Sequence, residues 1–380
     1  MTLLLALSLV GAWRPGAPMP APTYGFACAA VGNRIYAIGG LSDRQGLATP
    51  TNQVQVYEID RDTWLEGFSP LPRARGFSGC AALDGKIYVI GGTDMMYEYR
   101  RVDRYDPARD VWDTVASLPW SRQGLGACEF QGRIYAIGGY NSFAGGHFYR
   151  TVACFVPDSG PGHWNVVDSM AIGRTGLGVA VAGDRIYAVG GWFYGSLSSA
   201  EYYTPNQWNP ARQSMRVDRY GLAVAGSGRF LCAIGGRNHM DPLTTVEVFD
   251  DSLGEWQEAA SMSSPRAYLG VAIVGNAVYA IGGQDNHGTI GTVEIGSAPT
   301  GIEETPTPEK KAPAEPAGVF KTRIKLNAGT GLRIEIHDNA GKLVVAGRGA
   351  VDTELPEGVY FARVESADGT FVAGKVVVVR

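Results

Sequence analysis

Five arginines recur at one position of a repeating sequence pattern, thirteen residues before an apolar position that is tyrosine in four of the five cases. They are Arg75, Arg122, Arg174, Arg219 and Arg266, and Thr23 takes the same position in the first repeat. A planar guanidinium binds a carboxylate or sulfate through two parallel hydrogen bonds. The set therefore predicts recognition of an acidic or richly hydroxylated ligand. The alternative is a scaffold role, in which the arginines bind backbone carbonyls in the interior.

Aromatic and polar residues follow a diglycine in the same repeats. Aromatic rings offer flat faces to sugars and large contact areas to proteins, and amides and carboxylates offer hydrogen bonds. We expect these loops and the arginines to meet at one end of the molecule. The candidate ligand-binding residues are Arg75, Arg122, Arg174, Arg219, Arg266, Tyr140, Trp192, Tyr194, Asn238 and Asp285.

Motifs for catalysis are scarce. The sequence has no Gly-x-Ser-x-Gly elbow, phosphate-binding loop or His-Glu-x-x-His motif, so no catalytic residue is assigned. An enzyme would have to use an arginine with a nearby carboxylate, for which Asp218 and Asp285 are the candidates. His147, His239 and His287 also follow diglycines, but we expect neither a metal nor another cofactor. The five cysteines are odd in number and lack a Cys-x-x-Cys pair, which argues against a disulfide framework.

The elements that must position these residues are themselves repeated. An apolar run ending in a diglycine occurs six times, with the pairs beginning at residues 39, 91, 138, 190, 235 and 282. Downstream of most copies an extended segment ends in an aromatic residue, and a turn and a tryptophan follow, as in Tyr57 and Trp64. A period of this length is typical of a repeat architecture. The pattern resembles the kelch repeat over residues 13–298, and the resemblance implies an all-β, six-bladed propeller.

The sixth repeat runs into a proline-rich stretch and has no tryptophan of its own. We expect the N-terminus to supply the missing outer strand, with Trp13 in the position that Trp64 and Trp112 hold elsewhere. Joining the first and last strands in one blade would close the ring and protect its edges.

Beyond residue 298 the composition changes twice. Residues 299–318 carry five prolines and predict an extended linker. Residues 319–380 contain short apolar or alternating apolar and polar segments separated by turns. This pattern predicts a small immunoglobulin-like β-sandwich. This segment is similar to the type A sorting domain of the type IX secretion system, through the turn at 339–342, the Pro356-x-Gly358-x-Tyr360 motif and the basic ends of Lys375–Arg380. The resemblance implies export by the type IX machinery; a small adhesion module is the alternative.

Residues 1–12 are apolar and end in small residues, which predicts a signal peptide whose basic start is missing; an ordinary apolar N-terminus is the alternative. With a net charge of −4 and no apolar run of membrane-spanning length, neither a nucleic-acid partner nor a transmembrane span is expected. We expect a monomer that is secreted or displayed at the cell surface. Three functions stay open: a binding module for a protein or an acidic or hydroxylated glycan, a carbohydrate-active enzyme of the sialic-acid mutarotase kind, and a structural adhesion protein. A binding role is favoured over catalysis.

Overall fold

A computed structural model describes residues 12–299, except 45, 144, 159, 205–206 and 240, and the strands of a C-terminal segment within 321–378. The predicted signal peptide and linker lie almost entirely outside the described residues. The chain divides into two compact units, one spanning residues 6–303 and the other residues 304–380. No helix of the described residues is long and apolar enough to cross a membrane.

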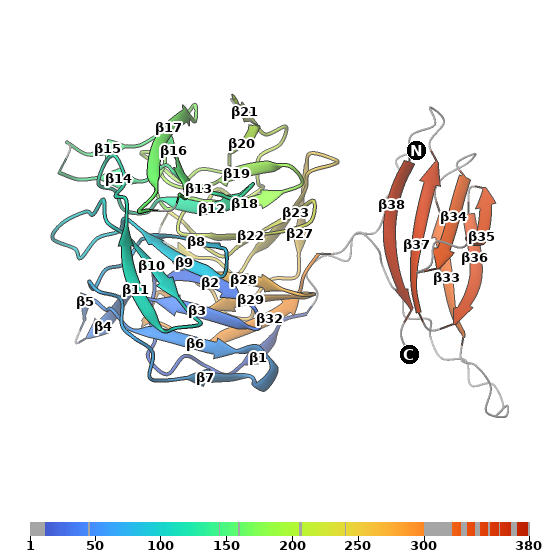
Figure 1. The fold of residues 1–380 in the computed structure, drawn as a ribbon, viewed down its shortest axis with the longest axis horizontal. Coiled ribbons are helices and arrows are strands. Elements are labelled where there is room, and N and C mark those ends of the chain that lie inside the picture. The colour runs from blue at the N-terminus through green and yellow to red at the C-terminus, as the bar shows by residue number, and fades with distance from the viewer. Residues whose placement is uncertain are drawn as a thin grey trace. The chain divides into compact units, whose positions relative to one another are not determined.

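The first unit contains six four-stranded antiparallel sheets, the blades of the predicted propeller (Figure 1). The innermost strands are rich in small residues, because these strands crowd around the axis. They are β2 (Ala27–Val31), β8 (Gly79–Leu83), β12 (Gly126–Phe130), β18 (Gly178–Ala182), β22 (Ala223–Ser227) and β28 (Gly270–Val274). Gly126 and Gly178 show the crowding, since a Cβ on either would lie 2.1 Å from a valine methyl of the next blade.

The second and third strands of each blade are packed on both faces and form most of the core. The second strands are β3 (Arg34–Ile38), β9 (Lys86–Ile90), β13 (Arg133–Ile137), β19 (Arg185–Val189), β23 (Phe230–Ile234) and β29 (Ala277–Ile281). The third strands are β6 (Val54–Glu58), β10 (Val102–Asp106), β16 (Thr151–Val156), β20 (Ala200–Thr204), β26 (Val246–Asp250) and β32 (Val293–Ser297). Their apolar side chains fill six clusters, each shared by two adjacent blades.

The outer strands include the one predicted to close the ring. They are β7 (Thr63–Leu65), β11 (Val111–Val115), β17 (His163–Ser169), β21 (Gln207–Pro210), β27 (Glu255–Ala259) and β1 (Arg14–Gly16). A short 3-10 helix, η1 (Ile59–Arg61), precedes β7. β1 pairs antiparallel with β32, with Arg14 opposite Ile295, so the N-terminus completes the sixth blade. The prediction for Trp13 is confirmed.

The diglycines end the second strands because no other residue fits there. Gly39 and Gly40 have φ angles of 67° and 95°, which residues with a side chain rarely adopt. A Cβ on Gly39 would lie 2.6 Å from the Arg75 carbonyl oxygen, and one on Gly40 would lie 2.8 Å from the Tyr24 carbonyl oxygen. The diglycine thus lets the backbone of the first blade contact the backbone of the second blade at Arg75 and its own entering chain at Tyr24.

Four of the segments after the diglycines form short hairpins. They are β4–β5 (Leu41–Arg44, Leu47–Pro50), β14–β15 (Tyr140–Asn141, His147–Phe148), β24–β25 (Arg237–Asn238, Asp241–Pro242) and β30–β31 (Gln284–Asp285, Gly288–Thr289). Because strands alternate in direction within a blade, these segments and the chain just before each innermost strand lie on one face of the propeller. We call it the loop face; β4, β5, β14 and β15 mark it at the left of Figure 1.

The second unit is also all-β. β33 (Lys321–Asn327) pairs with β36 (Ala350–Pro356), and a four-stranded sheet has the order β35 (Leu343–Arg348), β34 (Arg333–Asp338), β37 (Gly358–Glu365), β38 (Phe371–Val378). The short strands predicted for residues 319–380 are therefore present. The immunoglobulin-like sandwich and the sorting-domain assignment stay predictions.

Candidate functional site

The five repeated arginines lie inside the propeller, with 0–1% of each residue exposed. Four of them form ion pairs with an acidic side chain on the third strand of the same blade. The pairs are Arg75–Asp103 (2.9 Å), Arg174–Glu201, Arg219–Glu247 and Arg266–Glu294 (each 2.6 Å). The pair recurs because the register of the repeat is constant: each acid lies opposite the fourth residue of the second strand.

The fifth blade shows what such a pair holds together. Arg219 Nη1 donates to the carbonyls of Gly235 (3.1 Å) and Thr245 (2.9 Å), and Nη2 donates to Glu247. Glu247 also accepts from the backbone N–H of Arg216 (2.7 Å). Burial lowers the pKa of Arg219, and the attraction of Glu247 opposes that shift. The pair thus ties the segment before the innermost strand to strands two and three. This geometry favours the scaffold role of the arginines.

The third blade departs from this arrangement. Ala153 occupies the position of the acid, opposite Ala136, so Arg122 has no carboxylate partner among the described residues. Its guanidinium donates one hydrogen bond, from Nη1 to the Gly138 carbonyl (3.0 Å), while Nε and Nη2 lack partners. The Tyr149 ring lies 4.5 Å from the guanidinium carbon. Burial lowers the pKa of Arg122 to about 10.

A closed ring of backbone hydrogen bonds joins the six blades at the loop face. The ring residue lies two positions after each arginine or Thr23, and each ring N–H donates to the carbonyl of another ring residue at 2.6–2.8 Å. The members are Gly25, Phe77, Gly124, Gly176, Gly221 and Tyr268. All have positive φ, which is strained for Phe77 and Tyr268 (54° each). The rings of these two residues contact each other, with centroids 5.2 Å apart.

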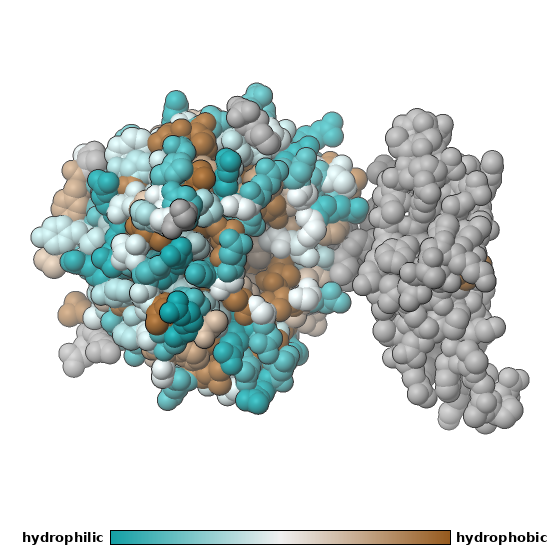
Figure 2. All heavy atoms as spheres, in the orientation of Figure 1, coloured by the Kyte–Doolittle hydropathy of each residue, from teal (hydrophilic) through white to brown (hydrophobic). Residues whose placement is uncertain are grey.

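Exposed apolar side chains gather on the loop face of the second, third and fourth blades. We define the aromatic patch as Met95, Met96, Tyr97, Phe143, Phe148, Phe193 and Tyr194. Half-buried Phe148 joins the third and fourth blades, with its ring 5.4 Å from that of Phe193 and 5.3 Å from that of Tyr194. Tyr97 stacks on Phe143 at 6.0 Å. Figure 2 shows hydrophobic residues at the left edge of the propeller, the side on which Figure 1 draws β14 and β15.

The exposure of the patch is large for aromatic side chains. Tyr194 is 80% exposed, Phe143 and Met96 are each 69% exposed, and Tyr97 is 58% exposed. Tyr194 and Met95 also have positive φ angles of 52° and 71°, so the loops hold their tips in a backbone conformation that such residues rarely adopt. Strain of this kind persists where the surrounding structure fixes it, and it is frequent at binding sites.

The other predicted site residues do not all join this patch. Tyr140 supports it, with its ring 4.8 Å from that of Phe148. Trp192 instead packs on Tyr220, at 5.0 Å between ring centroids. Asn238 donates to Asp218 at 3.1 Å, and Asp285 accepts from the His287 N–H at 2.7 Å, which is turn chemistry.

The residues with catalytic or metal-binding chemistry are likewise dispersed. Asp218 and Asp285 belong to the fifth and sixth blades and make separate contacts. No group of three or more His, Cys, Asp or Glu side chains that could hold a metal ion occurs in the part of the chain that the structure describes. The five cysteines are free, as the sequence predicted, and Cys154 and Cys232 are buried.

The sequence reasoning did not single out most of the patch. Met95, Met96, Tyr97, Phe143 and Phe148 were missed, although all five lie in loops that follow a diglycine, in the second and third blades. A usable signal existed, because three consecutive repeats carry two or more large apolar residues in this one loop.

Comparison with known proteins assigns the repeats. A profile of the KLHDC2/KLHL20/DRC7 kelch-repeats domain matches residues 12–191, and a kelch-motif profile matches residues 173–212, 219–263 and 265–295. The solved structure titled "Structure of YjhT" superposes with a TM-score of 0.61 at 17% identity, covering 74% of this chain and 95% of that one. That similarity shows the fold.

Curated relatives are similar in the propeller. "Kelch-like protein terF" of Aspergillus terreus is 28% identical over 265 residues, which is 64% of this chain and 57% of that protein. "Kelch-like protein 23" of Homo sapiens is 27% identical over 275 residues, which is 70% of this chain and 47% of that protein. The chain therefore spans about half the length of the curated relatives it matches.

Proposed function

Because this chain is a kelch-repeat protein whose propeller closes with six blades, we propose that it is a binding module that docks a protein partner on its loop face. The observation that carries the proposal is the aromatic patch, in which three consecutive blades present contacting, exposed aromatic side chains. Clustered exposed apolar side chains of this kind mark interaction sites.

The composition of the patch suits a protein better than a glycan. Aromatic residues and methionine are enriched in protein interfaces, where they supply the energetically dominant contacts. Met95 and Met96 offer flexible apolar chains that adapt to another apolar surface. A sugar site needs polar groups placed around its aromatic platform. The Asp94 carboxylate, next to Met95 in the chain, is instead engaged within its own loop, where it accepts from the Met96 and Tyr97 N–H groups (3.0 and 2.8 Å).

The patch is also held firmly enough to serve as a docking surface. Glu98 of the second blade accepts hydrogen bonds from the N–H (3.2 Å) and the hydroxyl (2.6 Å) of Ser142 in the third blade. Gln123 donates to the same carboxylate oxygen at 3.2 Å. A surface fixed before binding loses less conformational entropy when the partner docks.

The proposal is tested by selecting ligands with the full chain. A peptide-display library is passed over the immobilised wild-type protein, and a parallel selection uses Phe143→Ser/Tyr194→Ser. Enrichment of sequences with apolar anchors by the wild type alone supports the proposal. Absence of enrichment, or equal enrichment by both proteins, contradicts it. Saturable binding of a glycan by the wild type but not by the double variant would contradict a protein partner and indicate a sugar ligand.

We also propose that residues 319–380 direct export to the cell surface by the type IX secretion system. The support is the sequence resemblance together with two parts of its motif that fall in strands, Tyr360 in β37 and Lys375 in β38. The expected result in a host with this machinery is surface labelling of the full chain and retention of a chain that ends at residue 318. Equal labelling of both chains contradicts the export signal and would favour an adhesion role for the segment.

A further inference from the structure

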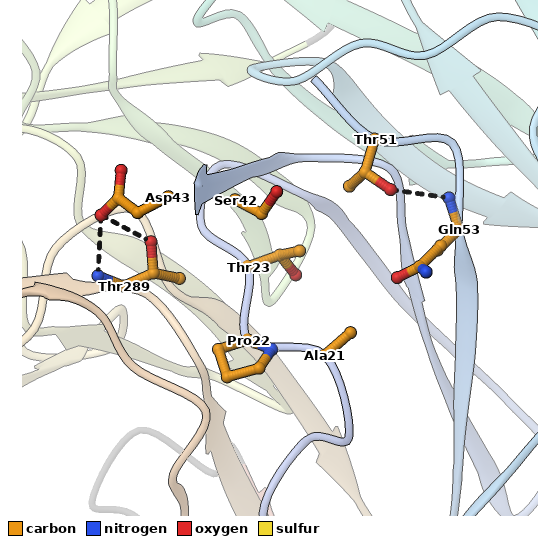
Figure 3. A pocket seen from close by; sticks show the side chains of 8 residues that line it. All are labelled: Ala21, Pro22, Thr23, Ser42, Asp43, Thr51, Gln53 and Thr289. Carbon is orange, nitrogen blue, oxygen red and sulfur yellow. Dashed lines mark hydrogen bonds between the residues drawn. The ribbon is translucent and has the colours of Figure 1, made fainter. Parts of the chain in front are cut away.

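The loop face carries a hollow of about 300 Å³ at the first blade, close to the lower limit for small-molecule sites. Its lining residues are Ala21, Pro22, Thr23, Ser42, Asp43, Thr51, Gln53 and Thr289. Figure 3 shows Thr23 and Ser42 between two hydrogen-bonded pairs, Asp43 with Thr289 and Thr51 with Gln53. None of these residues belongs to the aromatic patch.

Two repeat positions have lost their large side chains here. Thr23 stands where the five other blades carry the buried arginine. Thr51 donates its N–H to the carbonyl of the second glycine of the diglycine, Gly40. The residues that make the same bond in the other blades are all larger: Tyr99, Tyr149, Leu197, Leu243 and Ile290. The hollow therefore opens beside the residue from which an arginine extends in every other blade.

The backbone around that position keeps the same register. In the fifth blade, Gly235 N–H donates to the Thr245 carbonyl (3.1 Å), and Arg219 donates to the carbonyls of both residues. In the first blade, Gly39 N–H donates to the Gln53 carbonyl in the same way (2.9 Å). The carbonyls that accept from the guanidinium in the fifth blade thus have counterparts at Gly39 and Gln53. The position of the acid holds neutral Gln55, which is hydrogen-bonded to the backbone of Ala21.

The hollow itself favours a cation. Thr23 is 1% exposed, and its buried hydroxyl has no hydrogen-bond partner. Asp43 carries the single charge of the lining, and none of the eight lining residues is basic. The Asp43 carboxylate is oriented by Thr289, which donates from its N–H (3.1 Å) and its hydroxyl (3.0 Å) to one oxygen. A charged donor beside a carboxylate, carbonyls and hydroxyls forms stronger hydrogen bonds than a neutral one.

We propose that this hollow is an arginine-binding subsite, which takes the guanidinium group of a ligand in place of the arginine that the first blade lacks. The ligand's guanidinium lies over Thr23, faces Asp43 and enters from the loop face. This inference does not depend on the aromatic patch, and either site can exist without the other.

The test uses the full chain and two small probes that differ in charge but hardly in shape. N-acetyl-arginine amide carries the guanidinium, and N-acetyl-citrulline amide replaces it with a neutral urea. Titrations followed by NMR should show saturable binding of the arginine amide and binding of the citrulline amide that is weaker by about tenfold, since a hydrogen bond to a charged group is the stronger one. Equal affinities, or no binding of the arginine amide, would overturn the proposal.

Two variants locate the binding. Thr23→Arg supplies the missing side chain and should abolish binding of the arginine amide while the melting temperature is kept. Asp43→Asn should weaken binding severalfold, whereas Asp184→Asn should not, because Asp184 is an exposed acid (84%) on the turn between β18 and β19, away from the loop face. If Thr23→Arg does not fold, the Asp43 and Asp184 comparison decides. Unchanged binding in Asp43→Asn contradicts the site.

Discussion

Trp13 Nε1 donates a 2.8 Å hydrogen bond to the carbonyl oxygen of Ala260, across 247 residues of sequence. The same bond recurs between adjacent blades elsewhere in the ring. Trp64, Trp112 and Trp164 donate to Ala17, Ser69 and Ala116 at 2.8–2.9 Å. Each bond joins the outer strand of one blade to the chain just after the outer strand of its neighbour. The N-terminus therefore repeats, at the closure of the ring, a contact that belongs to the blade interface.

Replacing Trp13 tests that closure. Trp13→Ala removes both the hydrogen bond and the packing of the indole against the cluster around Val248. We expect a loss of about 3 kcal/mol in the free energy of unfolding, the lower end for a large aromatic, because Trp13 is only partly buried. Trp13→Phe should cost about 1 kcal/mol, the value of the hydrogen bond. Urea unfolding of both variants checks this, and unchanged midpoints contradict the role of Trp13.

The buried arginines should differ in their contribution to stability. Arg219→Met leaves Glu247 buried without its cation, which should cost about 3–5 kcal/mol. Arg122→Met leaves no carboxylate behind and loses one hydrogen bond and the contact with Tyr149, so we expect a cost of about 1 kcal/mol. The free energies of unfolding of the two variants are compared under the same conditions. Equal losses would show that the ion pair is not what holds the blade.

Tyrosine ionisation should limit stability in alkali. Burial raises the pKa of Tyr57 and Tyr105 above the usual value near 10, and hydrogen bonds to Asp62 and Asp110 add to the shift. Because the folded-state pKa is raised, the unfolded chain loses these protons first. The stabilisation is complete below about pH 10 and is lost as the pH rises above it. Melting temperatures measured between about pH 8 and 11, on both sides of the unfolded-state pKa of tyrosine, should fall at the alkaline end. Stability that rises over this interval contradicts it.

The two units should unfold independently. The chain divides near residue 303, and β32, the last strand of the propeller in the sequence, ends at Ser297. A chain that ends at residue 299 should therefore have the same melting temperature as the propeller transition of the full chain. Calorimetry of both proteins makes the comparison. A propeller transition that shifts by several degrees would mean that residues 300–380 stabilise the propeller.

The repeat made the fold accessible from the sequence. Six diglycines in register fixed the blades, and the missing tryptophan of the sixth repeat located the closing strand at Trp13. The arginines were the harder case. Their position in the repeat placed them at the loop face. The acids that neutralise four of them, however, lie 27–28 residues downstream and pair with them only in the folded blade.

The candidate site was predictable in part. Tyr140 and Tyr194 were identified because they follow a diglycine, and they do lie at the patch. Trp192 was identified by the same rule but turns toward Tyr220. Which loop side chain faces outward depends on the hairpin geometry, including the positive φ of Tyr194, and the repeat pattern does not encode it. The hollow at Thr23 arises because the first blade has threonine at two positions, 23 and 51, where the other blades have larger side chains. This difference is recognised only when the blades are compared with one another.

The most direct test of protein binding by the aromatic patch is the affinity of one selected peptide for three forms of the full chain. The wild type is compared with Phe143→Ser/Tyr194→Ser and with Leu253→Ser, which removes an exposed side chain (47%) from the turn between β26 and β27, away from the loop face. Isothermal titration gives each dissociation constant. We predict a loss of at least 2 kcal/mol, or about 30-fold, for the double variant, as expected for central aromatic anchors, and no loss for Leu253→Ser. Equal dissociation constants for all three proteins would contradict the account.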